Sequence, residues 1–125
     1  MTTKKLLLVD DNEDNRTLIK LALEMDTNWK ILLAANGIEG IEQAELLKPD
    51  AILLDLMMPE LDGLAVYDML KSNSATSSIP IIFMTATTRK NVISRLEDTA
   101  SAGILIKPLD MTSLKTQIKK LCQWN

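Results

Sequence analysis

The sequence predicts a single α/β domain in which helices cover both faces of a parallel sheet. Two observations support this prediction: five short apolar runs recur along the chain, and the segments between them have helical spacing of apolar residues. Each run is too short for a helix and lacks polar alternation, as expected for a strand buried on both faces. Strand and helix alternate five times, which is typical of a doubly wound α/β sandwich.

The predicted strands are spaced regularly, and turn signals separate them from the helices. By residue number the strands cover 6–9, 31–34, 51–54, 81–84 and 104–106. Asn36-Gly37 precedes the second predicted helix, Pro49-Asp50 leads into the third strand, and Pro80 opens the fourth. No linker, repeat or low-complexity tract interrupts this order, so we expect one domain over residues 1–125.

Apolar residues recur at helical spacing in the segments between the strands, and such a stripe normally faces the core. In the first segment the residues at i, i+3, i+4 and i+7 are Leu18, Leu21, Ala22 and Met25. In the last segment an apolar face is marked in the same way by Met111, Leu114, Ile118 and Leu121. The fourth helix is expected over about residues 89–100.

The composition is that of an ordinary globular protein. Hydrophobic residues make up 46% and charged residues 25% of the chain, and no apolar run approaches the ~18 residues of a membrane-spanning helix. The apolar run after Lys4 and Lys5 is too short for a signal peptide and ends in two acids. The single cysteine, Cys122, suits a reducing compartment, so we expect a cytoplasmic protein with no membrane partner.

Charge and residue usage exclude several classes of function. The net charge is -3, from 14 basic and 17 acidic residues, which gives no electrostatic reason to bind nucleic acid. The sequence contains no histidine, so Ser-His-Asp and Cys-His catalysis and the usual zinc sites are excluded. Any chemistry therefore depends on carboxylates, hydroxyls, lysines and backbone groups.

Reactive side chains stand at the ends of four of the five predicted strands. Asp10 and Asp11 directly follow the first strand, and Asp55 directly follows the third. Thr85 ends the fourth strand and Lys107 ends the fifth. Because open parallel sheets bind ligands outside the carboxyl ends of their strands, we expect these side chains to form one site.

This set of side chains suits phosphoryl chemistry. Three converging carboxylates repel one another and raise at least one pKa unless a cation is present, and Mg²⁺ prefers such oxygen ligands. A carboxylate beside the cation can attack phosphorus, with the lysine and the hydroxyl meeting the charge that develops. Taken singly, each residue has an ordinary alternative, such as a helix cap for Asp10 or Asp11. Taken together, they favour an active site.

Four motifs carry a resemblance to a known family. They are Leu8-Val9-Asp10-Asp11, Asp55-Leu56-Met57-Met58-Pro59 followed by Asp62-Gly63, Met84-Thr85-Ala86, and Lys107-Pro108. In order and spacing, the sequence from Lys5 to Leu121 resembles the receiver domain of two-component response regulators, in the single-domain form of the chemotaxis regulator. The resemblance implies a flavodoxin-like fold with strand order 2-1-3-4-5 and five helices. Because the 125 residues leave nothing over for a second domain, we expect no output domain.

By resemblance, Asp55 accepts a phosphoryl group in a phosphorelay. The implied donor is a phosphohistidine on a sensor histidine kinase or a histidine phosphotransfer protein, which fits a chain without histidine. Lys107 is implied to contact the phosphoryl group, and Thr85 to move toward it after transfer. The Lys107-Pro108 peptide is usually cis in the family. Such a chain is a signalling switch and not an enzyme with a separate substrate, although it catalyses its own phosphorylation and slow dephosphorylation.

The same resemblance implies a Mg²⁺ site. Asp11 and Asp55 are implied to bind the metal directly together with the backbone carbonyl of Met57, and Asp10 to act largely through water. Met57 and Thr87 are also positions that often tune the lifetime of the phosphorylated state. Met57 either shields the acyl phosphate from water or only packs as an apolar side chain.

One position departs from the family pattern. Receivers commonly carry Tyr or Phe three residues before the lysine, and its rotation follows the movement of the threonine; here that residue is Ile104. We therefore expect the switch region, Thr85, Ala86 and Ile104, to work mainly through the loop after Thr85 and the fourth helix. The usual partner surface is formed by helix 4, strand 5 and helix 5. Leu121 and Trp124 either extend that surface or cover the core, and the second interpretation is favoured.

Other functions of this architecture stay open at this point. A flavodoxin-type electron carrier needs a phosphate-binding loop after the first strand, where this chain has Asp-Asp-Asn-Glu-Asp. A phosphatase with an aspartyl nucleophile needs a second acid two residues after Asp55, and Met57 stands there. A phosphorylation-independent binding module would ordinarily lack an acid or the lysine. The target, the oligomeric state (monomer or phosphorylation-dependent dimer) and the relation to a longer regulator are left open.

Overall fold

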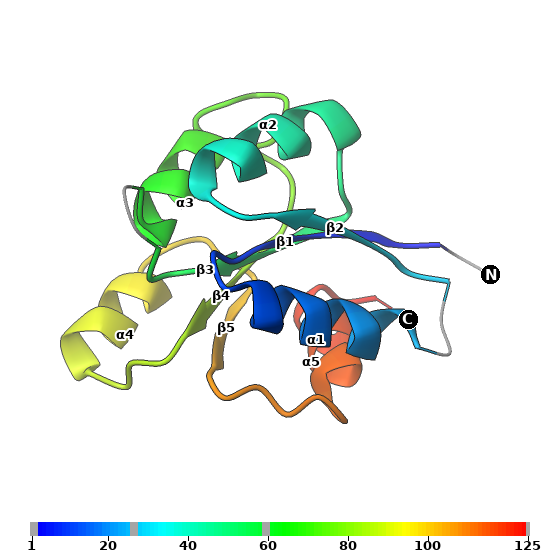
Figure 1. The fold of residues 1–125 in the computed structure, drawn as a ribbon. Helices are drawn as coiled ribbons and strands as arrows, with labels where there is room; N and C mark the ends of the chain where they lie inside the picture. Colours follow the sequence, from blue (N-terminus) through cyan, green and yellow to red (C-terminus); the bar gives the residue numbers. More distant parts are fainter. Residues whose placement is uncertain (1–2, 26–27, 59–60, 125) are drawn as a thin grey trace.

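The computed structural model describes residues 3–25, 28–58 and 61–124, and its centre is a parallel sheet of five strands (Figure 1). In chain order the strands are β1 (Lys5–Val9), β2 (Lys30–Ala34), β3 (Ala51–Asp55), β4 (Ile81–Thr85) and β5 (Gly103–Ile106). They pair side by side in the order β2-β1-β3-β4-β5, and every pairing is parallel. Each predicted strand is present, and the predicted strand order is confirmed.

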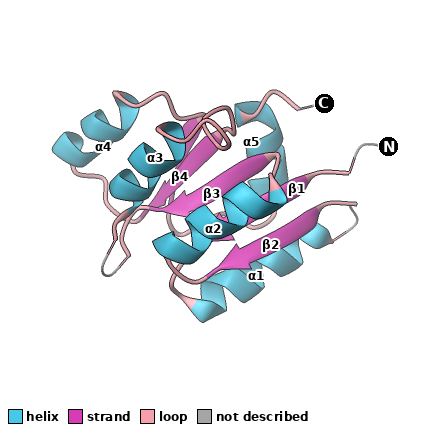
Figure 2. Cartoon of the chain, turned by 90° about the horizontal axis from the view of Figure 1, so that it is seen from above, coloured by secondary structure: helices cyan, strands magenta, loops and turns pink. Residues whose placement is uncertain are grey.

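Five helices alternate with these strands. They are α1 (Glu13–Glu24), α2 (Gly37–Leu47), α3 (Gly63–Lys71), α4 (Lys90–Glu97) and α5 (Leu114–Leu121). Helices α1 and α5 pack on one face of the sheet, and α2, α3 and α4 contribute to the core on the other (Figures 1 and 2). Helix α4 is shorter than expected, because residues 98–100 already lead toward β5. Within the described ranges, none of the helices has the length and apolar character to cross a bilayer.

Apolar side chains fill a core on both faces of the sheet. Along β1, Leu6 and Leu8 belong to the core beneath α1 and α5. Leu7 and Val9 belong to the core beneath α2, α3 and α4. Every residue of β3 and β4 is buried. This two-sided burial explains why the strands appear in the sequence as continuous apolar runs.

Short polar side chains cap the first three helices. Asn12, Asn36 and Asp62 each accept a hydrogen bond from the backbone N–H three residues ahead, at 2.8, 2.9 and 2.9 Å. Asn12 therefore takes the capping role at α1 that Asp10 or Asp11 would otherwise have had. Helices α4 and α5 begin without a side-chain cap.

The apolar face expected for α1 is not the face that the helix buries. Leu18, Leu21 and Met25 are 53%, 61% and 56% exposed. The core contacts come instead from Ile19 and Leu23, which are almost completely buried. Ile19 lies roughly 100° around the helix from Leu18. The periodicity correctly predicted a helix, but this helix has two neighbouring apolar sides, and the prediction of the buried one was wrong.

The predicted apolar face of the last helix is confirmed. Leu114 and Ile118 are fully buried, and Leu121 packs against the same core. Trp124 meets Trp29 edge-on, with the ring centroids 5.4 Å apart. Leu121 and Trp124 therefore cover the core, as the favoured interpretation expected.

A matched pair of leucine substitutions tests which side of α1 faces the sheet. Leu23→Ala removes a fully buried side chain and should lower the free energy of unfolding by about 2–5 kcal/mol. Leu21→Ala, on the exposed side, should change it by less than about 0.5 kcal/mol. Urea unfolding of both variants measures the two changes, and equal losses would contradict this assignment of the buried side.

Candidate functional site

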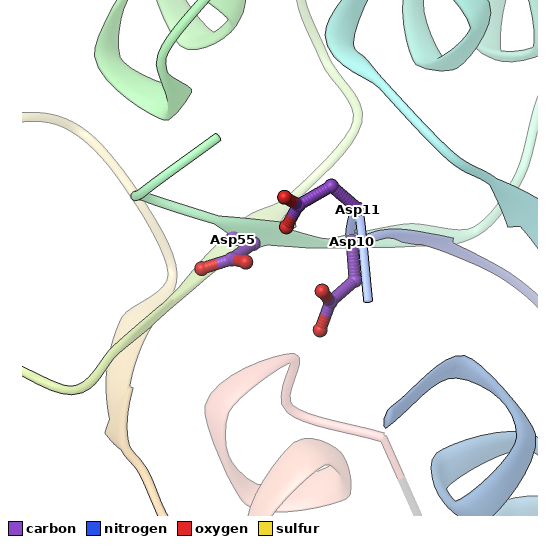
Figure 3. A group of neighbouring side chains, drawn as sticks. All are labelled: Asp10, Asp11 and Asp55. Carbon is purple, nitrogen blue, oxygen red and sulfur yellow. The ribbon is translucent and has the colours of Figure 1, made fainter. Parts of the chain in front are cut away.

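Three carboxylates meet at the edge of the sheet where β1 and β3 end (Figure 3). Asp10 and Asp11 directly follow β1, and Asp55 is the last residue of β3. One ligand oxygen from each lies within 4.8 Å of those of the other two. Asp10 is fully buried and Asp55 is 3% exposed, whereas Asp11 is exposed. The structure thus brings together the three acids that the sequence singled out.

The ammonium group of Lys107 lies against two of these carboxylates. Its Nζ is 3.3 Å from Asp55 Oδ2 and 3.6 Å from Asp10 Oδ2. The backbone N–H of Lys107 donates to the carbonyl of Thr85 at 2.8 Å, so the ends of β5 and β4 are joined beside the acids. The Lys107-Pro108 peptide is cis, as the resemblance implied.

One oxygen of the Asp10 carboxylate is buried without a hydrogen-bond donor. Its Oδ1 accepts from the backbone N–H of Asn12 at 2.9 Å. Its Oδ2 has no hydrogen-bond partner among the described residues, and the Lys107 ammonium at 3.6 Å is beyond hydrogen-bond distance. A buried acceptor in this state is unfavourable until water or a cation completes its contacts.

The donor set fits a hard divalent cation. Carboxylate oxygens are the protein ligands that Mg²⁺ prefers, and Mg²⁺ keeps several of its own waters. The Asp10 oxygen without a hydrogen-bond partner and the exposed carboxylate of Asp11 are both available as ligand atoms for a cation. Lys107 offsets part of the repulsion between the acids when no metal is bound. The residues are therefore compatible with the Mg²⁺ that the resemblance implied.

Burial raises the pKa of the Asp55 carboxyl from 3.8 to about 6. The loss of hydration is the largest cause, and the nearby charge of Asp10 acts in the same direction. The Lys107 ammonium lowers the pKa, as does the backbone N–H of Met57, which donates to Asp55 Oδ1 at 3.3 Å. Asp55 is therefore mainly ionised at neutral pH, and the ionised form is the nucleophilic one.

The residues expected to form the switch region lie at the end of β4, directly after it, and on β5. Thr85 is fully buried, and its Oγ1 accepts from the backbone N–H of Thr87 at 3.1 Å. Ala86 follows it and is exposed. Ile104 is partly buried against the core beneath α2, α3 and α4. These positions connect the edge of the site with the side of the sheet covered by α4.

Two hollows border the site. One of them lies beside Met57, which is 68% exposed. This exposure does not fit the alternative in which Met57 only packs as an apolar side chain. The hollow beside it has a volume of about 390 Å³ and is lined by Met57, Ala86, Thr87, Arg89 and Val92. A second cavity of about 510 Å³ lies between α1 and the segment after β5, with Lys107 and Leu18 in its wall.

Two residues that the sequence did not assign to the site help to hold it. The N–H of Gly63 donates to the Leu56 carbonyl at 2.9 Å, and a Cβ on Gly63 would lie 2.6 Å from the carbonyl oxygen of Asp55. Such a close approach to the backbone of Asp55 requires glycine. Arg16 of α1 donates from Nη1 to the backbone carbonyl of Asp10 at 2.7 Å. The motif that contains Gly63 marks that position in the sequence, whereas no pattern distinguishes Arg16.

The fold and this edge of the sheet agree with a comparison to known families. The model of the response regulator receiver domain matches residues 6–119, so the chain belongs to the response regulator receiver domain family. This is a phospho-accepting domain of two-component signalling, and the interpretation based on the four motifs is confirmed. The flavodoxin and phosphatase alternatives receive no support from this comparison.

Individual relatives agree with the family. The chain is 30% identical over 116 residues to the polar-differentiation response regulator DivK of Brucella anthropi, covering 93% of this chain and 94% of DivK. It is 31% identical over 117 residues to the DNA-binding dual master transcriptional regulator RpaA of Synechocystis. That match covers 94% of this chain but only 48% of RpaA, so the chain spans about half the length of that relative. The chemotaxis response regulator CheY4 of Vibrio cholerae has the same fold, with a TM-score of 0.87, 25% identity, and coverage of 96% and 99%.

The raised pKa of Asp55 predicts a pH dependence of stability in the metal-free protein. The folded-state pKa of about 6 exceeds the ordinary value of 3.8, so folding takes up a proton between these values and stability falls as pH rises through them. Asp55→Asn removes this charge and should raise the free energy of unfolding at pH 8 by on the order of 2 kcal/mol.

At pH values below about 4 the gain from Asp55→Asn should be much smaller, because the buried carboxyl of the parent protein is then protonated. Urea unfolding in EDTA at the two pH values measures both differences. An equal gain at the two pH values would contradict this origin of the effect.

Proposed function

We propose that this receiver domain is switched by phosphorylation of Asp55. The observation that carries the proposal is the convergence of three carboxylates and the Lys107 ammonium at one edge of the sheet. The donor is a phosphohistidine on a sensor histidine kinase or a histidine phosphotransfer protein, as the family implies, and a sequence without histidine fits a donor outside it. The domain promotes its own phosphorylation and slow dephosphorylation and acts on a protein target through the change in its surface.

The proposed chemistry uses the Asp55 carboxylate as the nucleophile and the Lys107 ammonium beside it as the stabilising charge. An oxygen of Asp55 attacks the donor phosphorus, and the new O–P bond forms as the N–P bond to the imidazole breaks. The electron pair of that bond stays on the ring nitrogen, which a proton from solvent neutralises. Lys107, 3.3 Å from Asp55, stabilises the charge on the phosphoryl oxygens, and the Thr85 hydroxyl meets it from the end of β4.

The same acids would hold the metal. Asp11, Asp55 and the backbone carbonyl of Met57 would bind Mg²⁺ directly, and Asp10 would act largely through water. Bound Mg²⁺ supplies positive charge that offsets the negative charge of the phosphoryl oxygens. The Asp10 oxygen without a donor and the exposed Asp11 carboxylate support this assignment.

The signal leaves the site through the end of β4. Movement of Thr85 toward the phosphoryl group breaks the hydrogen bond between its Oγ1 and the N–H of Thr87, which frees the loop that leads into α4. Helix α4 has no side-chain cap and is held to the core chiefly by Leu96, so little attachment opposes its movement. Ile104 has no ring to rotate, so the loop and α4 carry the change to the surface of α4, β5 and α5.

The donor docks on an exposed apolar stripe along α1, which is formed by Leu18, Leu21 and Met25. Leu18 lines the cavity of about 510 Å³ that Lys107 also lines. Met25 lines a further cavity of about 390 Å³ together with Met111. The stripe therefore continues into the site to which the donor must bring its phosphohistidine. A donor helix can pack on it through apolar contacts.

Acetyl phosphate with Mg²⁺ tests the acceptor. The mass of the intact protein should rise by one phosphoryl group, and Asp55→Asn should abolish the increase because an amide forms no acyl phosphate. Asp68→Asn serves as the matched control, since Asp68 is an exposed acid on α3 away from the cluster. An unchanged mass in a folded protein that binds Mg²⁺ would rule out Asp55 as the acceptor.

Substitution of Leu21 tests the docking surface. In Leu21→Lys the rate of transfer from a phosphorylated histidine kinase should fall about tenfold, because a charge replaces an apolar contact at the interface. The rate with acetyl phosphate should not change. Ile38→Lys, at a similarly exposed leucine-sized residue on α2, is the control and should leave both rates unchanged. Slowing of both rates by Leu21→Lys would indicate damage to the site and not loss of docking.

A further inference from the structure

Arg16 reaches from α1 to the backbone that carries the first two acids. Its Nη1 donates to the carbonyl oxygen of Asp10 at 2.7 Å, and this bond is partly buried. The backbone N–H of Arg16 donates to the carbonyl of Asn12 at 3.1 Å, so Arg16 is fixed within the first turn of the helix. Its side chain therefore joins a rigid helix to the end of β1.

The carbonyl of Asp10 belongs to the peptide unit that joins Asp10 to Asp11. Because a peptide unit is planar, a hydrogen bond that fixes this carbonyl also fixes the plane in which the Cα of Asp11 lies. The direction in which the Asp11 side chain leaves the backbone depends on that plane. The bond from Arg16 thus acts on the position of Asp11, although Arg16 does not contact its carboxylate.

The two acids differ in how they are held. Asp10 is fixed by other bonds as well: its N–H donates to the Ala34 carbonyl at 3.1 Å, and its Oδ1 accepts from the Asn12 N–H at 2.9 Å. Asp11 is exposed, and within the described ranges no group donates to its carboxylate. Its placement therefore depends on the backbone, which the bond from Arg16 fixes before Asp11 and the bond from the Asn12 N–H to Asp10 fixes after it.

Arg16 acts through a hydrogen bond to a neutral group and not through an ion pair. In the described part of the chain, the ion pairs within 4.0 Å involve Lys20 and Lys107, and none involves Arg16. A guanidinium group suits this task because it presents several N–H donors in a rigid plane. The effect on a metal ligand should consequently depend little on ionic strength, unlike that of a distant charge.

We propose that Arg16 is a positioning residue for the metal-binding acids: its bond to the Asp10 carbonyl holds Asp11 where it binds Mg²⁺. This inference rests on the Mg²⁺ site of the proposed function. Residues that orient metal ligands from outside the ligand set typically contribute about 10–100-fold to metal affinity. Because Arg16 acts on one ligand through one bond, its contribution should lie near the lower end of this range.

The test is Mg²⁺ titration by calorimetry in the absence of a phosphodonor. Arg16→Met keeps the apolar stem of the side chain and removes its donors, and it should weaken Mg²⁺ binding about tenfold. Arg16→Lys keeps a donor on a shorter side chain, and it should lose about threefold. Lys20→Met, which breaks the Lys20–Glu24 ion pair on the same helix, is the matched control and should stay within about twofold of the parent protein.

A double-mutant cycle separates positioning of Asp11 from a general effect on the fold. In an Asp11→Asn background, Arg16→Met should weaken Mg²⁺ binding little further, because the ligand through which it acts has already been changed. Two independent losses that multiply would contradict the proposal. Loss of the guanidinium charge by itself would favour the binding of a cation, so weaker Mg²⁺ binding in Arg16→Met would come from the lost hydrogen bond and not from the lost charge.

The outcomes distinguish this inference from the proposed function. If the parent protein does not bind Mg²⁺, the metal site of the proposed function is wrong. If the parent protein binds Mg²⁺ and folded Arg16→Met binds it within twofold as tightly, the role of Arg16 is wrong and the site stands. If Arg16→Met does not fold, as judged by circular dichroism, Arg16→Lys decides, and parent-like affinity in that variant would overturn the proposal.

Discussion

The ammonium group of Lys107 lies between two buried carboxylates, and the arrangement of the site depends on its charge. Asp10 is fully buried and Asp55 is 3% exposed, and the Lys107 ammonium offsets the repulsion between their negative charges. Lys107 follows β5 at the edge of the sheet, yet it reaches the acids at the carboxyl ends of β1 and β3 across the end of β4. This reach requires the carboxyl ends of four strands to stay in register, which the parallel pairings and the bond from Lys107 to the Thr85 carbonyl provide.

Locally unfavourable features gather at this edge of the sheet, and the rest of the fold compensates for them. They include a buried Asp10 oxygen without a donor, a carboxyl at Asp55 whose pKa is raised to about 6, and the approach of Gly63 to the backbone of Asp55. The core beneath them is apolar on both faces, with every residue of β3 and β4 buried. Such a division, with consistent packing in the core and unfavourable groups at one edge, is typical of a functional site on a stable scaffold.

The sequence was sufficient for the fold and for the acids, because both follow from where apolar runs end. A strand that ends in Asp55 or Thr85 places that residue at the carboxyl edge whatever the helices do. It was not sufficient for the orientation of α1, because two neighbouring sides of this helix are both apolar. Leu18 and Leu21 are exposed, whereas Ile19 and Leu23 are buried. Arg16 was missed for a related reason, since a helical arginine near solvent has the same appearance in a sequence whether or not it bonds to a distant backbone carbonyl.

The pair formed by Trp29 and Trp124 determines what intrinsic fluorescence can report. These are the two tryptophans of the chain, and Trp29 directly precedes the amino end of β2, whereas the acids follow the carboxyl ends of β1 and β3. A strand of five residues separates the two ends by roughly 16 Å. Tryptophan emission should therefore report unfolding of the C-terminal segment, but it should change little when Asp55 is phosphorylated. Spectroscopic work on this switch requires a probe placed at the other end of the sheet.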